Sequence, residues 1–342
     1  IMSGIVMMII AIVVLGGAYL LYGRYLQNKW GIDPKAKTPA YEMEDGVDYV
    51  PADTNVVFGH QFASIAGAGP INGPIQAAIF GWLPVMLWIL IGGVFFGAVQ
   101  DFASMYASVK NKGRTIGYII EAYIGKLGKK LFLLFCWLFC ILVVAAFADV
   151  VAGTFNGFVT DNAGTVTRVA ANGAVATTSM LFIIEAVGLG FFLKYSKFNK
   201  WINTAVAILL LVLAIALGLK FPVYVSLGTW HIIIFAYILV ASVAPVWALL
   251  QPRDYLNSYL LIFMIVGAVI GVFAANPSCN LKAFTSFNVD GQYMFPILFV
   301  TIACGAVSGF HSLVSSGTAS KQIKNEKNML PVSFGAMLME SM

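Results

Sequence analysis

Residues 55–78 read NVVFGHQFASIAGAGPINGPIQAA, and this stretch decides the fold. It is apolar enough to enter a membrane, but Pro70 and Pro74 cannot both lie inside one unbroken helix, because each lacks an amide proton and clashes with the preceding turn. At membrane depth, the backbone groups that such a break frees must be covered by protein or must line a water-filled cavity. Interrupted membrane segments of this kind point to transporter binding sites. We therefore predict a broken helix with a binding role.

Composition places this stretch in a membrane protein. Of the 342 residues, 60% are hydrophobic and 10% are charged, whereas soluble domains have about 25% charged residues. Several apolar runs approach the ~20 residues that cross a bilayer as a helix. We therefore predict an all-α, polytopic protein that resides in the lipid bilayer. The net charge of +5 comes from loops between these runs, so no nucleic-acid partner is expected.

We expect nine crossings and the start of a tenth, in a single transmembrane domain over residues 1–342. The predicted spans are 4–22, 55–80, 83–109, 131–155, 179–194, 201–219, 230–250, 257–275 and 293–316, with a tenth from 329. No cleavable signal is evident, because no basic region precedes the first run and no cleavage site follows it. Between the spans we expect a polar external loop over 156–178 and a short amphipathic helix over 114–127 at the inner surface.

Basic residues predict the orientation, because Lys and Arg mark cytoplasmic loops. Alternate loops carry 17 of the 20 basic residues, and the other loops carry only Arg168, Lys220 and Lys282. This alternation holds only if residues 55–80 cross the membrane fully despite their break. We therefore expect a multi-pass protein of the cell membrane, with the N-terminus outside and the 24–54 loop in the cytoplasm.

A second interruption is expected in the span over 230–250, where Pro245 removes a helical hydrogen bond. This span comes five crossings after the first break and runs in the opposite direction, which is typical of the inverted repeat of LeuT-like transporters. We predict a first repeat over 55–219 and a second over 230–342 that is incomplete where the chain stops. The span over 4–22 is then peripheral to both repeats. A simple proline kink in the later span is the alternative.

The two breaks supply the predicted substrate site. Amides and carbonyls freed between Gly67 and Gly73 can bind an ion or a carboxylate, and a half-helix that starts after a proline directs its positive dipole end at an anion. The predicted substrate-binding residues are Gly67, Gly69, Pro70, Asn72, Gln76, Ser242 and Pro245. The alternative is a kinked helix that packs through its small residues.

Ionisable side chains within spans are functional candidates because their burial in hydrocarbon is costly. We predict His60, Asp101 and Glu185 as proton-coupling residues, since a carboxyl group in an apolar site, or an imidazole, can bind and release a proton near neutral pH. Each of them could instead pair with a buried partner. His311 is left open between a functional and a structural role.

Three hydroxyl groups lie close together near the end of the ninth span, on Ser315, Ser316 and Thr318. They could contribute to a shell of oxygens around a small cation or a substrate, because hard cations need several converging oxygens. The alternative is that each hydroxyl binds a carbonyl of its own helix. No HExxH motif, Cys/His cluster or nucleophile–base pair is present, so we expect no metal, no cofactor and no enzymatic activity.

Five long and unusual stretches are spread over nearly the whole chain. They are DGVDYVPADTNVVFGHQFASIAGAGPINGP (45–74), GAVQDF (97–102), GRTIG (113–117), ASVAPVWALLQPRDYL (241–256) and SGFHSLVSSGTASKQI (308–323). Through them the sequence closely resembles the carbon starvation protein A (CstA) family of peptide transporters, in the amino acid–polyamine–organocation superfamily. The resemblance implies a LeuT-like fold, peptide uptake in nutrient-poor cells and proton coupling, and some members of the family resemble pyruvate carriers.

Two features depart from the family pattern. Gln61 stands where the family usually has a second histidine, which argues against a histidine pair that binds protons or metal. Members of the family also extend well beyond a position like Met342, so transport by this chain alone would require the missing spans to be supplied.

Together, the residues and the resemblance predict a secondary active transporter that takes up small peptides with protons as part of the response to carbon starvation. Sodium is the alternative coupling ion, and pyruvate or another small carboxylate is the alternative substrate. The alternatives of another class are a membrane sensor or subunit that does not transport, and a membrane enzyme.

Overall fold

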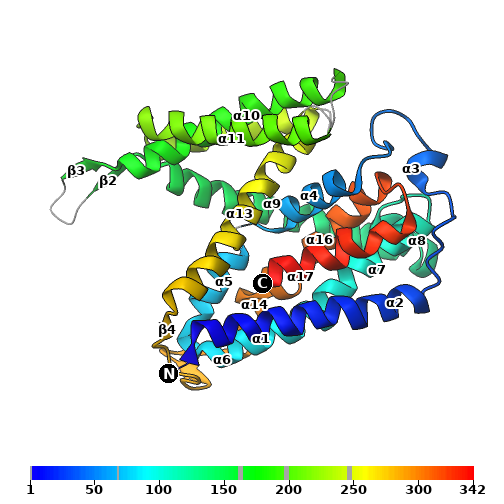
Figure 1. The fold of residues 1–342 in the computed structure, drawn as a ribbon, viewed down its shortest axis with the longest axis horizontal. Helices are drawn as coiled ribbons and strands as arrows, with labels where there is room; N and C mark the ends of the chain where they lie inside the picture. The colour runs from blue at the N-terminus through cyan, green and yellow to red at the C-terminus, as the bar shows by residue number, and fades with distance from the viewer. Residues whose placement is uncertain (1, 68, 161–164, 196–199, 245–248) are drawn as a thin grey trace. The chain divides into compact units, whose positions relative to one another are not determined.

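The computed structural model describes residues 2–67, 69–160, 165–195, 200–244 and 249–342 (Figure 1). Contacts divide the chain into two compact units. One contains Ile1–Tyr123 and Leu261–Met342, and the other contains Ile124–Leu260.

Six helices in the described ranges are long and apolar enough to cross a membrane, as judged by length and composition. They cover Gly4–Lys29, Trp82–Lys110, Lys126–Phe155, Ala170–Phe192, Ile202–Lys220 and Pro252–Ala275. A shorter apolar helix covers Leu227–Val243. Many of their large apolar side chains are exposed, which fits helices that face hydrocarbon rather than water. The prediction of a helical protein with several membrane-compatible helices is confirmed, and the protein is mostly helical with a few short strands.

Three helical stretches of the first unit each contain a π-helical segment. α1 (Gly4–Gly17) continues through η1 (Ala18–Gly23) into α2 (Arg24–Lys29). α6 (Trp82–Gly92) continues through η3 (Gly93–Ala98) into α7 (Val99–Lys110). η6 (Leu330–Gly335) leads into α17 (Ala336–Ser341). A π segment accommodates one more residue per turn than an α-helix, and such segments often lie at functional sites.

The remaining elements of the first unit are short. They are α3 (Pro39–Glu42), α8 (Ile116–Ile124), η4 (Ala319–Lys321), η5 (Glu326–Asn328), and strands β1 (Met2–Ser3), β4 (Ser278–Cys279), β5 (Asn288–Val289) and β6 (Gln292–Tyr293). β1 pairs antiparallel with β4, and β5 pairs antiparallel with β6. α8 lies within the 114–127 segment, where a short amphipathic helix is predicted.

The second span is interrupted where the prolines and glycines predict it. α4 (Thr54–Ile65) ends at Ala66, which has a non-helical backbone conformation, and α5 (Gly69–Ala77) begins a new helix that closes in the 3-10 turn η2 (Ala78–Phe80). Pro70 lies in the first turn of α5, where a missing amide proton costs nothing, and Pro74 lies inside the same helix. The prediction that the two prolines cannot share one helix is therefore wrong, because the break falls before both of them.

The ninth span is also interrupted, although the sequence predicts one continuous helix over 293–316. α14 (Met294–Thr301) and α15 (Ala303–Ala306) are followed by extended backbone at Val307 and Ser308, and α16 (Gly309–Gly317) then begins. No proline marks this break. The prediction of an unbroken ninth span is therefore wrong. The carbonyls of Gly305 and Ser308, beside the break, accept hydrogen bonds from Ser341 and Gln100 on other helices.

α5 packs closely on the first half of the ninth span. A Cβ atom at Gly73 would overlap the backbone carbonyl oxygen of Thr301, and a Cβ atom at Gly69 would lie 2.5 Å from that of Cys304. The glycines that break the second span thus also allow its second half to approach α14 and α15. This contact brings the two interrupted spans together.

The core of the first unit is built from α7, η6 and α17. Phe102, Met105, Phe334 and Met337 are fully buried in one cluster, and the ring of Trp30 stacks on Phe102 with 4.8 Å between ring centroids. Burial of each such side chain contributes about 1.5–3 kcal/mol. This packing holds rigidly the helices that carry the polar groups described below.

The second unit contains four long helices and a hairpin. They are α9 (Lys126–Phe155), the antiparallel strands β2 (Phe158–Thr160) and β3 (Val166–Arg168), α10 (Ala170–Tyr195), α11 (Lys200–Lys220) and α12 (Leu227–Val243). α13 (Leu250–Ala275) begins in this unit and continues into the other. One of its cores packs Phe155 against Trp230, with ring centroids 5.1 Å apart.

Two expectations for this unit differ from the structure. The polar loop predicted over 156–178 ends at Ala170, where α10 begins, because alanine favours helix and Thr177 donates a hydrogen bond to the carbonyl of Phe221. α12 ends at Val243, whereas the sequence predicts a span that continues to residue 250. Pro245, the predicted cause of a second break, lies outside the described residues.

The packing of α5 yields a first test, in the complete natural protein. Gly73→Ala should lower the free energy of unfolding by about 1–3 kcal/mol, because the added methyl overlaps a backbone carbonyl. Gly16→Ala is the matched control, since a Cβ atom there meets nothing within 4 Å and alanine favours helix. Thermal unfolding in detergent compares the two, and equal melting temperatures would contradict the close approach of α5 and α14.

Candidate functional site

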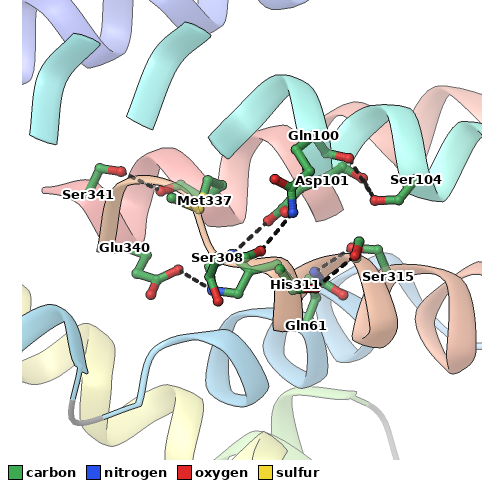
Figure 2. Close-up of polar contacts among 12 residues, drawn as sticks. Gln61, Gln100, Asp101, Ser104, Ser308, His311, Ser315, Met337, Glu340 and Ser341 are labelled. Carbon is green, nitrogen blue, oxygen red and sulfur yellow. Dashed lines mark hydrogen bonds and ion pairs between the residues drawn. The ribbon is translucent and has the colours of Figure 1, made fainter. Parts of the chain in front are cut away.

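A buried cluster of ionisable side chains lies beside the break of the ninth span. Asp101 on α7, His311 on α16 and Glu340 on α17 form it, and we call it the His311 cluster (Figure 2). His311 Nδ1 is 3.2 Å from Asp101 Oδ2, and His311 Nε2 is 3.4 Å from Glu340 Oε2. The side chains of all three are fully buried. One imidazole ring therefore lies between two carboxyl groups.

Several polar atoms of the cluster make no hydrogen bond among the described residues. They are Asp101 Oδ1, His311 Nε2 and both carboxyl oxygens of Glu340. A buried charge without compensating partners is very costly. The cluster is therefore a place where a proton or another cation would be strongly stabilised.

Side chains of the second span form hydrogen bonds with residues in the second half of the ninth span. Gln61 Nε2 donates to Ser315 Oγ at 2.8 Å, and His60 Nε2 lies 2.9 Å from Thr318 Oγ1. Both residues are on α4, directly before its break, and both are buried. The polar residues at the start of the second span therefore join α4 to α16.

Two further hydrogen bonds hold the carbonyls on either side of the break in the ninth span. Gln100 Nε2 donates to the carbonyl of Ser308 at 2.7 Å, and Ser341 Oγ donates to the carbonyl of Gly305 at 3.0 Å. These donors are the chain neighbours of Asp101 and Glu340. Each carboxyl group of the cluster is thus next in sequence to a residue that binds the broken backbone.

The hydroxyl groups predicted to bind a cation or substrate make other contacts. Ser316 Oγ donates to the carbonyl of Ser312 at 2.7 Å, and Thr318 Oγ1 donates to that of Val314 at 3.1 Å. Both bonds are the helix-internal alternative. Ser315 accepts from Gln61, and a role for the three hydroxyls in ligand binding stays a prediction.

The substrate residues predicted on α5 lie at or near its surface. Asn72 and Gln76 are exposed, as is Gly67 before the helix, whereas Gly69 and Pro70 are partly covered by their contact with α15. Their role in binding substrate stays a prediction.

The other predicted residues belong to the second unit. Glu185 is on α10, and its Oε2 atom is buried without a hydrogen-bond partner among the described residues. Ser242 donates to the carbonyl of Leu239 at 2.8 Å, which is again a bond within its own helix. The predicted roles of both residues stay untested.

Sequence reasoning missed Glu340 and Cys304 and left His311 open. A signal for Glu340 was available, since it is an ionisable residue in the apolar run of the predicted tenth span. Cys304 Sγ, a ring nitrogen of His311 and a carboxyl oxygen of Glu340 lie within 4.8 Å of one another, so these are the atoms that could approach a metal ion. Zinc sites in proteins use four ligands, or three with a water molecule. A metal ion and a proton are therefore alternative occupants of this cluster, and an experiment must distinguish them.

A second polar network ties residues 318–328 to the 24–54 loop. The buried carboxylate of Glu326 accepts from Lys110 Nζ at 2.7 Å and from the backbone amide of Asp33 at 2.9 Å. Ala52 pairs with Ile323 in a parallel bridge. In the same loop, backbone amides led by that of Val47 donate to Asp45 and lower the pKa of its carboxyl group. This network anchors the chain between α16 and η6.

Comparison with known proteins finds relatives that are named as transporters. The family model of carbon starvation protein CstA matches residues 3–342. Peptide transporter CstA of Escherichia coli K12 is 39% identical over 343 residues, which cover 95% of this chain and 46% of the relative. Pyruvate/proton symporter BtsT of the same strain is 37% identical over 340 residues, covering 95% and 45%.

Peptide transporter CstA of Bacillus subtilis is 36% identical over 355 residues, covering 99% of this chain and 56% of the relative. The chain thus spans about half the length of the curated relatives it matches. No solved structure matches it.

The network around Glu326 yields a second test. Lys110→Ala leaves a buried carboxylate without its cation, and we expect the free energy of unfolding to fall by about 3–5 kcal/mol. Lys324→Ala is the control, because Lys324 Nζ is 3.9 Å from Asp53 at an exposed position, and such pairs contribute about 0–1 kcal/mol. Thermal or denaturant unfolding measures the stability of both variants, and an equal loss in the two would contradict the stabilising ion pair between Lys110 and Glu326.

Proposed function

The chain belongs to the carbon starvation protein CstA family, and from that premise we propose that it forms part of a secondary active transporter. The proposed transporter takes up small peptides together with protons, and it acts when carbon sources are scarce. The names of the relatives support this proposal, since most of those found are named peptide transporters and one is named a pyruvate/proton symporter.

The geometry that best supports transport is the meeting of two interrupted helices. The break after Ile65 and the break at Val307–Ser308 lie in spans that pack on one another through α5 and α15. Paired interruptions of this kind build substrate sites near the membrane midplane, because unwound backbone offers amides and carbonyls where the bilayer otherwise offers none. We therefore place the substrate at these breaks.

The proposed architecture is the LeuT-like inverted repeat, with 55–219 as the first repeat and 230–342 as part of the second. Its motivation is the predicted order of the spans, in which the interruption expected at Pro245 comes five crossings after the first one and runs in the opposite direction. The ninth span corresponds in this scheme to the fourth, which is the uninterrupted α9. The two repeats therefore differ at this pair, and the break in the ninth span is a specialisation of the second repeat.

A carboxylate is the substrate group that the second span is suited to bind. Small peptides and pyruvate both carry one, and the first turn of α5 presents free backbone amides and the positive end of a helix dipole. A peptide also carries an ammonium group, which requires an acceptor that pyruvate does not need. We propose the peptide as substrate and pyruvate as the alternative.

We propose the cell membrane as the location, with the Lys- and Arg-rich loops in the cytoplasm. The proton is the proposed coupling ion, because buried carboxyl and imidazole groups lie beside the breaks. Sodium is the alternative, and uptake that follows a sodium gradient without a proton gradient would favour it.

Uptake into proteoliposomes that contain the complete natural protein tests this function. We expect a labelled dipeptide or tripeptide to accumulate when the lumen is more alkaline than the medium. Unlabelled peptide should compete, and pyruvate should compete weakly. Stronger competition by pyruvate would select the alternative substrate, and an absence of uptake and exchange for both would refute the proposal.

The predicted substrate residues on α5 give a third test. Replacement of Asn72 by Leu, or of Gln76 by Leu, should raise KM for the peptide about tenfold, which corresponds to the loss of one hydrogen bond. Ile75→Leu on the same exposed helix is the matched control and should leave KM unchanged. An unchanged KM in both polar variants, with uptake intact, would remove these side chains from the substrate site.

A further inference from the structure

We infer that the His311 cluster is where the coupling proton binds, and that its occupancy is relayed to the broken backbone of the ninth span. The inference rests on the proposed function and extends it, because it assigns His311 and Glu340 as coupling residues. It also gives Gln100 and Ser341 a positioning role.

The first argument is the balance of charge in a dry site. Asp101 and Glu340 can carry two negative charges, and His311 can carry one positive charge. Even with a protonated imidazole, ionised carboxyl groups leave one uncompensated negative charge among fully buried side chains. Such a charge is costly in a membrane interior. One additional proton on a carboxyl group restores neutrality.

The second argument is the pattern of hydrogen bonds. Three carboxyl oxygens of the cluster, Asp101 Oδ1 and both oxygens of Glu340, make no hydrogen bond among the described residues. An ionised carboxylate offers only acceptors, whereas a protonated one carries an O–H donor. A bound proton would thus supply a donor where the cluster has an excess of acceptors.

The third argument is the position of the imidazole. Its two nitrogens face carboxyl groups on different helices, with Asp101 on α7 and Glu340 on α17. An imidazole can accept a proton at one nitrogen and release a proton from the other. His311 is therefore placed to move a proton between the two carboxyl groups, with no net change in the charge of the ring, which is left as its other tautomer.

The neighbouring elements contribute few other titratable groups. α15 contributes Cys304, α4 contributes His60, which contacts Thr318, and η4 contributes Lys321, which pairs with Asp48 at 3.5 Å. Lys321 therefore does not balance the negative charge of the His311 cluster, because it already pairs with Asp48.

The relay follows from two hydrogen bonds on either side of the break. Gln100 precedes Asp101 on α7 and holds the carbonyl of Ser308, and Ser341 follows Glu340 on α17 and holds the carbonyl of Gly305. A change of charge that moves α7 or α17 relative to His311 must also move one of these donors. Proton binding would then alter the unwound backbone at Val307, where we place the substrate.

Exchange and accumulation in proteoliposomes separate this inference from the proposed function. Exchange of labelled for unlabelled peptide needs no proton gradient, whereas accumulation against a gradient does. We expect Asp101→Asn and Glu340→Gln to retain exchange and to lose accumulation driven by an imposed pH difference. Retained exchange also shows that the variants fold. Asp149→Asn is the matched control, since this carboxylate on α9 is exposed, and it should keep both activities.

The test of the two positioning residues, Gln100 and Ser341, needs a measurement that a loss of folded protein alone would not change, and the number of protons carried per peptide is such a measurement. Ser341→Ala and Gln100→Leu should transport peptide with fewer protons per molecule than the wild type, measured with a pH-sensitive dye in the lumen. An unchanged ratio in both variants would overturn the relay.

Other outcomes are equally decisive. A wild-type protein that neither exchanges nor accumulates peptide or pyruvate would refute the proposed function, and this inference with it. A wild type that accumulates peptide, together with cluster variants that accumulate it equally, would refute this inference alone. Zinc added to purified protein distinguishes a metal site. Stoichiometric binding that is lost in Cys304→Ser, with pH-driven accumulation intact in Glu340→Gln, would make the cluster a metal site and overturn the proton assignment.

Discussion

Backbone groups that are freed at membrane depth must be satisfied from within the protein, and the unit formed by residues 1–123 and 261–342 is built around this constraint. Two spans are interrupted, and the break in the ninth span is held by side chains of other helices. The carbonyls beside Val307 accept from Gln100 and Ser341, while Gln61 and His60 contact α16. The polar residues of an otherwise apolar unit are thus concentrated where helical hydrogen bonding stops.

The same residues serve structure and chemistry. Donors that satisfy the broken backbone lie next in sequence to Asp101 and Glu340, so the supports of the break also place two carboxyl groups beside His311. A change of charge at the site can therefore reach the backbone, because the helices that carry Asp101 and Glu340 also carry the donors, Gln100 and Ser341, that bond the carbonyls at the break. This coupling suits a protein whose proposed work is to change conformation when a proton binds.

Sequence reasoning recovered features with a local cause and missed those with a tertiary cause. The break of the second span followed from its prolines and glycines, and the long apolar helices followed from composition. The break at Val307–Ser308 was not predicted, because it has no proline and the donors that bond its carbonyls, Gln100 and Ser341, are distant in the sequence. Asp101 was identified by its place in an apolar span. Its partner His311 is distant in the sequence, so only the fold could reveal the pair.

The π-helical segments have a consequence for the angular register of the site. Asp101 follows η3 and Glu340 follows η6 within a few residues. Successive residues of an α-helix are rotated by about 100°, whereas a π segment takes one more residue to complete each turn. The additional residue in each segment is therefore absorbed within the wide turn, and it does not rotate the carboxyl group that follows away from His311. Single-residue deletions in η3 or η6 should accordingly be tolerated better than single-residue deletions in the α-helical turns of α7 or α17, which would rotate Asp101 or Glu340 relative to the preceding helix.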